Sequence, residues 1–173
     1  DENGTAICDG GGFHAGDAVT MRETVRLAKR FGVAVGAHPS WQDRDGFGRN
    51  EMTLPAGEAE TLVREQVQAL AAIARAEGVE LRHVKPHGAL YNQAAKDREL
   101  ANAIARAVKT VSGELVLVGL AGSGLVEAGL EVGLRVADEG FPDRNYNPDG
   151  MLVSRREPHA IIESPEQVAA HAL

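Results

Sequence analysis

Short apolar segments alternate with longer amphipathic ones along the chain. Four of the short segments are nearly continuous apolar runs, which is the pattern of strands buried on both faces of a sheet. They span residues 33–37, 81–85, 115–120 and 134–137. Residues 160–162 form a weaker fifth candidate, and the start of the chain shows no clear strand.

Between these strands, apolar residues recur every three or four positions, as on one face of an amphipathic helix. The predicted helices span residues 18–31, residues 55–77, a segment starting at Asp97, one after Gly124 and one after Ser164. Asp17 and Ser164 stand where an N-cap side chain accepts a hydrogen bond from the first helical turn.

Buried strands that alternate with amphipathic helices are typical of an α/β fold with mainly parallel strands. A complete eight-unit (β/α) barrel takes ~250 residues. The 173 residues of this chain therefore supply roughly five to six units. We expect a single α/β domain over residues 1–173, either an open sheet or an incomplete barrel with terminal units missing.

Composition excludes several classes of protein. The net charge of −7 argues against a nucleic-acid binder, which needs a basic surface to displace counterions. No apolar run reaches the ~20 residues of a membrane span. The single cysteine, Cys8, allows neither an internal disulfide nor a cysteine-based zinc site. Because the chain also starts without the features of a signal peptide, a cytoplasmic location is expected.

Polar residues gather just after the predicted strands, where parallel α/β proteins place their chemistry. Four of the six histidines lie near this edge, namely His14, His38, His83 and His87. Strand alternation places His38 and Lys85 on faces that point into one common mouth. A lysine in that position would serve as an acid/base group or as an anion clamp. For His83, in the middle of its strand, a structural role is favoured.

A glycine-rich turn, residues 119–124, follows the third predicted strand and precedes a helix. Its free backbone N–H groups could hold an anion. It is not a P-loop, because no Gly-Lys-Ser/Thr sequence follows.

Six ordered segments resemble the LamB/YcsF family. They are residues 12–17 (GFHAGD), 36–39 (GAHP), 46–49 (GFGR), 83–92 (HVKPHGALYN), 118–123 (VGLAGS) and 141–146 (FPDRNY). The similarity runs from about residue 12 to the end of the chain. Family members begin with a strand that carries an Asp-x-Asn-x-Asp-x-Gly-Glu segment, which residues 1–11 do not supply. A C-terminal strand and helix of the family are also missing.

The resemblance implies a deformed (β/α) barrel, related in shape to glycoside hydrolase and deacetylase barrels. It also implies ATP-dependent hydrolytic opening of the 5-oxoproline ring to L-glutamate, with ATP as co-substrate, in an enzyme whose B and C subunits are separate chains. A bound divalent metal and a homo-oligomer both remain open.

This chemistry needs groups that bind phosphate or an oxyanion, a base for water and an acid for the ring nitrogen. The residues expected to act in catalysis are His14, His38, Lys85 and His87. Those expected to bind the substrate are Asp17, Asn92, Asp143 and Arg144. Those expected to bind phosphate are Gly122, Ser123 and Gly124.

Two other functions stay open at this point. His14 and His38, with a carboxylate from the first strand, could hold a metal ion in a deacetylase-like hydrolase acting on C–N bonds of a carbohydrate or cyclic amide. Alternatively, the chain is a non-catalytic binding or scaffold subunit whose partners carry the nucleotide chemistry.

Overall fold

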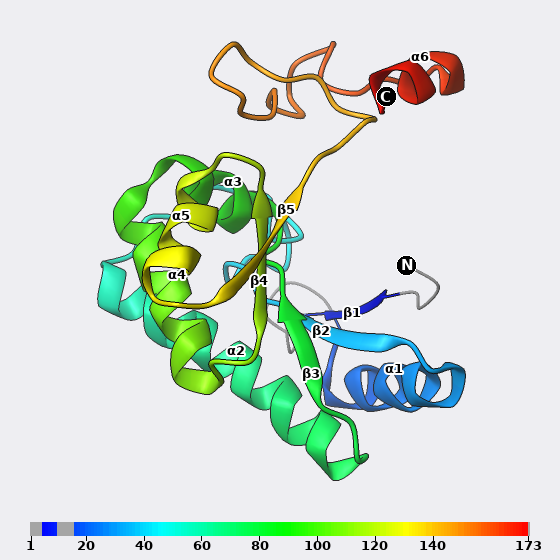
Figure 1. The fold of residues 1–173 in the computed structure, drawn as a ribbon, viewed down its shortest axis with the longest axis vertical. Helices are drawn as coiled ribbons and strands as arrows, with labels where there is room; N and C mark the ends of the chain where they lie inside the picture. The colour runs from blue at the N-terminus through cyan, green and yellow to red at the C-terminus, as the bar shows by residue number, and fades with distance from the viewer. Residues whose placement is uncertain (1–4, 10–15, 173) are drawn as a thin grey trace.

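Five parallel strands form the centre of the molecule (Figure 1). The computed structural model describes residues 5–9 and 16–172. The strands are β1 (Thr5–Asp9), β2 (Ala34–His38), β3 (Leu81–Val84), β4 (Val116–Leu120) and β5 (Arg135–Glu139). They lie side by side in chain order, and each pairs in parallel with the next.

Six helices accompany these strands in the described part of the chain. They are α1 (Ala18–Phe31), α2 (Ala56–Ala76), α3 (Gly88–Lys96), α4 (Arg98–Val111), α5 (Gly124–Glu131) and α6 (Pro165–His171). The expected caps are confirmed. Asp17 accepts a hydrogen bond of 2.8 Å from the Thr20 amide, and the Ser164 hydroxyl accepts one from Gln167.

Sequential strand order distinguishes this sheet from a doubly wound one. Right-handed connections between strands that never reverse their order carry the helices to one face of the sheet, as in a (β/α) barrel. The residues of β2 to β4 that face the helices, including Val35, Val84 and Leu117, are fully buried in the main core. Among the described strands β1 and β5 remain at opposite edges. The predicted α/β fold with an incomplete barrel is confirmed.

The other face of the sheet carries several candidate functional residues. Gly36 on β2 lies directly beneath the ring of His83 on β3, and a Cβ atom at Gly36 would stand 2.1 Å from His83 Nε2. Lys85, two residues beyond His83, follows on the same side just after β3. The alternation predicted from the sequence therefore places Gly36, His83 and Lys85 correctly.

Three elements differ from the sequence-based expectation. β1 pairs with β2, although its short segment showed no clear strand pattern. α3 forms in a segment for which no helix was predicted, and Ala89, Leu90 and Ala94 pack into the core. Residues 160–162 do not form a strand. Ile161 makes only an isolated antiparallel bridge to Arg144, outside the sheet.

The segment after β5, residues 140–172, is called the C-terminal arm. It leaves the sheet at the carboxyl end of β5 and folds back on itself at the top of Figure 1. A small apolar cluster attaches it to the body, in which Phe141, Tyr146 and Leu152 pack against Tyr91 and Leu120. The arm therefore stands over the edge of the sheet where functional residues are expected.

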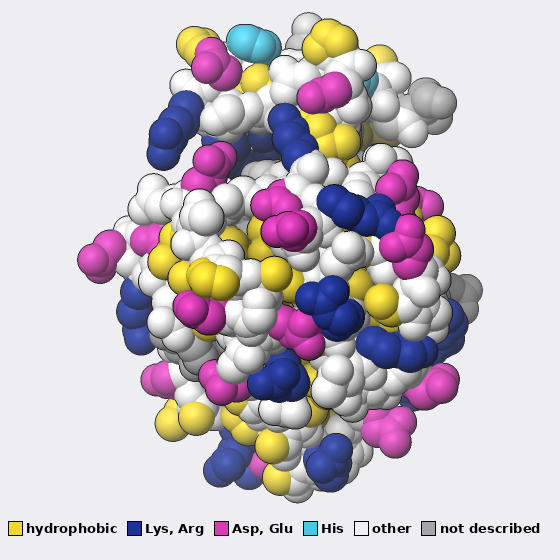
Figure 2. Space-filling model, turned by 90° about the vertical axis from the view of Figure 1, so that its left-hand side faces the viewer, with side chains coloured by type: hydrophobic (Ala, Val, Ile, Leu, Met, Phe, Trp, Pro, Cys, Tyr) yellow, Lys and Arg dark blue, Asp and Glu magenta, His cyan; other side chains and the backbone are white. Residues whose placement is uncertain are grey.

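The surface formed by the helices carries charged side chains of both signs. Figure 2 shows basic and acidic side chains interspersed over the helical face. Arg98 pairs there with Glu127 and Glu131, and Arg106 with Glu60. No helix in the described part of the chain has both the length and the apolarity to cross a bilayer.

Candidate active site

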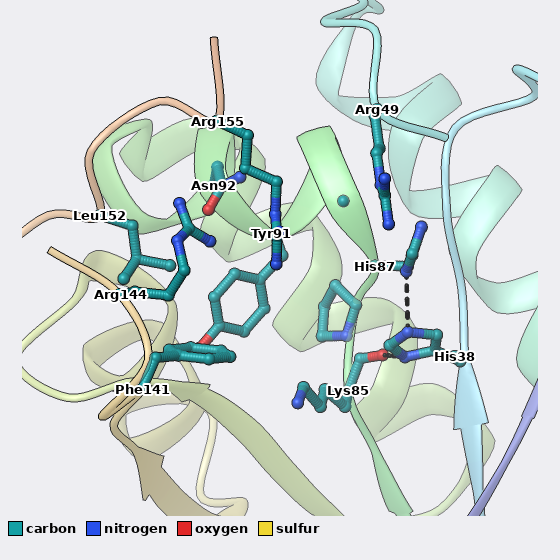
Figure 3. A pocket seen from close by; sticks show the side chains of 12 residues that line it. His38, Arg49, Lys85, His87, Tyr91, Asn92, Phe141, Arg144, Leu152 and Arg155 are labelled. Atoms are coloured by element: carbon teal, nitrogen blue, oxygen red, sulfur yellow. Dashed lines mark hydrogen bonds between the residues drawn. The ribbon is translucent and has the colours of Figure 1, made fainter. Parts of the chain in front are cut away.

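A pocket of about 160 Å³ opens where the carboxyl ends of β2 and β3 meet α3 and the C-terminal arm. Figure 3 shows its two walls, with His38, His87 and Arg49 on one side and Tyr91, Phe141 and Arg144 on the other. The residues that line it are His38, Arg49, Lys85, Pro86, His87, Gly88, Tyr91, Asn92, Phe141, Arg144, Leu152 and Arg155. The predicted convergence of His38, Lys85 and His87 on one depression is therefore observed.

Two histidines form a hydrogen-bonded pair at the base of the pocket. His38 Nε2 lies 2.9 Å from His87 Nδ1. The outer nitrogen of each ring meets a backbone carbonyl: His38 Nδ1 lies 2.6 Å from Lys85 O, and His87 Nε2 lies 2.9 Å from Phe47 O. The rings meet edge to face, with centroids 4.8 Å apart.

These three contacts constrain which ring nitrogens carry a hydrogen. A carbonyl oxygen only accepts, so His38 Nδ1 and His87 Nε2 must each carry a hydrogen. The two inner nitrogens then need one further proton to form a hydrogen bond rather than to oppose two lone pairs. The three hydrogen bonds are satisfied together when the pair holds one proton more than two neutral imidazoles. That further proton would lie between the two rings.

The ammonium of Lys85 is paired across the pocket floor with the carboxylate of Glu139. Glu139 also accepts a hydrogen bond of 3.1 Å from the hydroxyl of Tyr91. The Lys85 ammonium stands 5.4 Å from the ring centroid of Phe141. Burial, followed by the charge of Glu139, raises the pKa of Tyr91, so that this phenol stays protonated and donates. The ammonium of Lys85 is therefore fixed in position by its ion pair with Glu139.

Three arginines give the upper part of the pocket a positive potential. Arg49, Arg144 and Arg155 line it, and among the described residues none of them forms an ion pair with a carboxylate. Arg144 is 4% exposed and donates to the carbonyls of Ala160 and Val153. Burial, and then the charge of Arg155, lowers the pKa of Arg144. An anionic group would relieve this unbalanced charge.

The loop over residues 43–50 positions His87 and Arg49. Asp43 accepts from the amides of Gly46 and Asn50, and these bonds hold the pKa of its carboxyl below the ordinary value. Phe47 adopts φ 54°, a left-handed conformation that costs energy in a residue other than glycine. Its carbonyl is the one that meets His87, so the strained residue contributes directly to the site.

His83 has the structural role that the sequence favoured. It is 8% exposed, packs on Gly36 and does not line the pocket. Burial, followed by the charge of Lys85, lowers the pKa of His83, and a neutral ring results.

Several predicted site residues lie elsewhere. Asp17 is exposed and caps α1, and Asp143 is exposed and does not line the pocket. Gly122, Ser123 and Gly124 do not line it either, and Gly124 packs against the carbonyls of Ala94 and Ala95 at the end of α3. Asn92 and Arg144 do line the pocket. His14 lies outside the described residues.

Glu139, Tyr91, Arg49 and Arg155 are site residues that the sequence-based prediction did not select. Glu139 ends β5, so the strand-end rule that selected His38 and Lys85 could have found it. Tyr91 and Arg49 both occur within the matched family segments. Arg155 follows the family-like residues Leu152 and Val153, but only the folding of the C-terminal arm shows that it reaches the pocket.

A metal site is not formed by the described residues, which contain no cluster of three or more histidine, cysteine or acidic side chains. In this arrangement both ring nitrogens of His38 already make hydrogen bonds. The backbone of Asp9, at the end of β1, is in register with that of His38. The backbone of one acidic residue of the first strand, Asp9, therefore lies next to the backbone of His38.

Comparison with known proteins supplies independent evidence. A LamB/YcsF family model matches residues 7–173. The 5-oxoprolinase A subunit of Chloroflexus aggregans is 59% identical over 154 residues, which cover 89% of this chain and 61% of that protein. The 5-oxoprolinase A subunit of Tolumonas auensis is 56% identical over 162 residues, covering 94% of this chain and 64% of that protein.

A solved structure is similar as well. The lactam utilization protein from Thermus thermophilus matches with a TM-score of 0.85 and 48% identity, covering 96% of this chain and 66% of that one. The chain spans less than two thirds of the length of these two curated relatives, 61% and 64%.

Proposed function

This chain belongs to the LamB/YcsF family, and from that premise we propose that it carries the hydrolytic site of a 5-oxoprolinase A subunit. The proposed reaction is the ATP-dependent hydrolytic opening of 5-oxoproline to L-glutamate, in an enzyme completed by separate B and C subunits. The observation that carries the proposal is the convergence on one small pocket of a hydrogen-bonded histidine pair, an ion-paired lysine and arginines that form no ion pair among the described residues.

The size and charge of the pocket suit such a substrate. Pockets for drug-sized ligands measure ~300–1,000 Å³, and this one, at about 160 Å³, suits a smaller molecule. 5-Oxoproline is a five-membered lactam with one carboxylate. Arg144 and Arg155, with Asn92 beside them, offer the charge and hydrogen bonds that fix a carboxylate at one end of the pocket.

The opposite end of the pocket suits the lactam group. Opening the ring adds a water oxygen to the carbonyl carbon and breaks the C–N bond, after which the nitrogen takes a proton. The shared proton of His38 and His87 is placed to be that proton, and Lys85 is placed to stabilise negative charge developing on the carbonyl oxygen. In the assembled enzyme ATP would transfer its terminal phosphoryl group to the amide oxygen and leave as ADP, and after water has added to the carbon this group would leave as inorganic phosphate. The negative charge that Lys85 would face is then that of the phosphorylated oxygen. We assign Gly122, Ser123 and Gly124 no part in this.

A direct test uses the full-length protein, assembled with its B and C subunits, and measures glutamate and ADP formed from 5-oxoproline and ATP. Each product should require all three chains together. Metal-dependent release of acetate from an acetylated sugar, without ATP, would instead favour the deacetylase-like function. Full activity of the B and C subunits alone would favour a scaffold role for this chain.

Replacing Lys85 by Ala should lower kcat by a factor on the order of 10²–10³, because one stabilising group for the developing oxyanion is lost. The matched control is Lys96→Ala, since Lys96 is exposed on α3 and outside the pocket. Near-normal turnover by Lys85→Ala would remove this lysine from the mechanism.

A further inference from the structure

Glu139 has no role in the chemistry assigned so far, yet it contacts two residues that line the pocket, Lys85 and Tyr91. One of its carboxylate oxygens, Oε1, accepts from the ammonium of Lys85. The other, Oε2, accepts from the hydroxyl of Tyr91. Because each oxygen has its own donor, the carboxylate cannot rotate without breaking one of the two bonds.

These contacts join three separate elements across the sheet. Lys85 follows β3, Glu139 ends β5, and β4 lies between those two strands. Leu120 of β4 stands in register with Glu139. Neighbouring strands are about 4.8 Å apart, so the ion pair must cross two such spacings. Two long side chains can make that span, whereas an aspartate in place of Glu139 would be too short.

The pair is also largely removed from solvent. The side chain of Lys85 is 20% exposed and that of Glu139 is 22% exposed. A charged group in this position is costly unless an opposite charge and further hydrogen bonds compensate it. The Phe141 ring beside the ammonium and the Tyr91 hydroxyl on the carboxylate provide that additional compensation.

We propose that Glu139, anchored by Tyr91, is a positioning residue that holds the charged end of Lys85 at a fixed point on the pocket floor. The catalytic consequence rests on the proposed function, because Lys85 is the group that touches the substrate. The positioning itself is a property of the pocket and can be measured without turnover.

The first experiment is therefore independent of activity. The full-length protein and its Glu139→Gln variant are treated with limiting acetic anhydride, and the acetylation rate of each lysine is read by peptide mass spectrometry. Lys85 should react severalfold faster in Glu139→Gln, while Lys96 and Lys109 should react at unchanged rates. The matched control is Asp138→Asn, one residue earlier on β5 and exposed, which should leave the rate at Lys85 unchanged.

The second experiment measures kinetics in the assembled enzyme. Glu139→Gln and Glu139→Asp should each lower kcat by a factor on the order of 100, as displacement of a reacting group by about 1 Å does, with little change in KM for 5-oxoproline. Tyr91→Phe should give a smaller loss of the same kind. In a Lys85→Ala background, Glu139→Gln should cause no further loss, since a residue that acts through Lys85 has nothing left to position.

The outcomes separate the two proposals. Faster labelling of Lys85 in a protein whose wild type does not open 5-oxoproline would support the positioning and reject the proposed function. Unchanged labelling in Glu139→Gln would overturn the positioning, whatever the activity. So would kinetic losses that multiply in the double variant, because Glu139 would then act independently of Lys85. A single cooperative thermal unfolding transition, even at a lower midpoint, shows that each variant has folded.

Discussion

Two imidazoles between two backbone carbonyls form the acid of the proposed reaction. The identity of the carbonyls decides the chemistry, because neither Lys85 O nor Phe47 O can donate. In the proposed reaction, the proton between His38 and His87 is the one that the ring nitrogen takes when it leaves. The arginines opposite bring charge without a counterion among the described residues, which suits an anionic substrate.

Replacing His87 by Ala should lower kcat in the assembled enzyme by ~10²–10⁴-fold, the usual contribution of a general acid. KM for 5-oxoproline should change little, because the carboxylate contacts remain. Nitrogen NMR of the wild-type imidazoles should show three ring protons on the His38–His87 pair at neutral pH. Two neutral rings would contradict the proton count, and His159→Ala, at an exposed position, serves as the control.

At the scale of elements, the site depends on how closely neighbouring segments approach. β2 can pass beneath the His83 ring only because Gly36 has no side chain. The loop after β2 is held equally closely. Gln66 of α2 bonds both the amide and the carbonyl of Ser40, and the fully buried Trp41 donates to Gln93 of α3. Each element thereby fixes the next one around the pocket.

Replacing Gly36 by Ala should reduce the free energy of unfolding by ~1–3 kcal/mol, because the new Cβ overlaps the His83 ring and forces it to move. Gly57→Ala is the matched control, since nothing lies within 4 Å of a Cβ at that position in α2. It should be neutral or stabilising by up to about 1 kcal/mol. Chemical denaturation measures both, and an unaffected Gly36→Ala protein would disprove the close approach.

Acidification should loosen the loop over residues 43–50. The pKa of Asp43 is lowered in the folded protein, chiefly by its bond to the Asn50 amide. The stability that its carboxylate contributes is therefore present above its ordinary pKa of 3.8 and is lost as the pH falls through the lower folded value. In that pH range, hydrogen exchange at the Gly46 and Asn50 amides should become faster relative to the intrinsic exchange rates of these amides. Asp43→Asn should show the faster exchange already at neutral pH.

At the scale of the whole molecule, the C-terminal arm completes the pocket that the sheet begins. Arg144 ties distant parts of the arm together through the carbonyls of Val153 and Ala160 while its guanidinium also lines the pocket. One side chain thus links the folding of the arm to the binding of an anion. The position of Arg155 depends on the same link.

Replacing Arg144 by Lys should leave the charge but lose the two-pronged bond to the arm. We expect the free energy of unfolding to fall by ~1–3 kcal/mol, because a buried carbonyl loses its donor. KM for 5-oxoproline should rise as the pocket wall loosens. Hydrogen exchange over residues 141–162 reports the loosening, and Arg156→Ala, at an exposed position of the C-terminal arm, is the control. If hydrogen exchange in Arg144→Lys matched the wild-type protein, the two hydrogen bonds of Arg144 would not be needed to hold the arm, and its charge would be sufficient.

The sequence by itself determined the alternation of strands and helices, the helix caps and the edge of the sheet where His38 and Lys85 meet. These features follow from local periodicity and from the geometry of parallel strands. Only the tertiary structure decided that α3 is a helix, that Glu139 reaches Lys85 across β4, and that Arg155 joins the pocket. Each of these depends on contacts between residues far apart in the chain, where local periodicity carries no information.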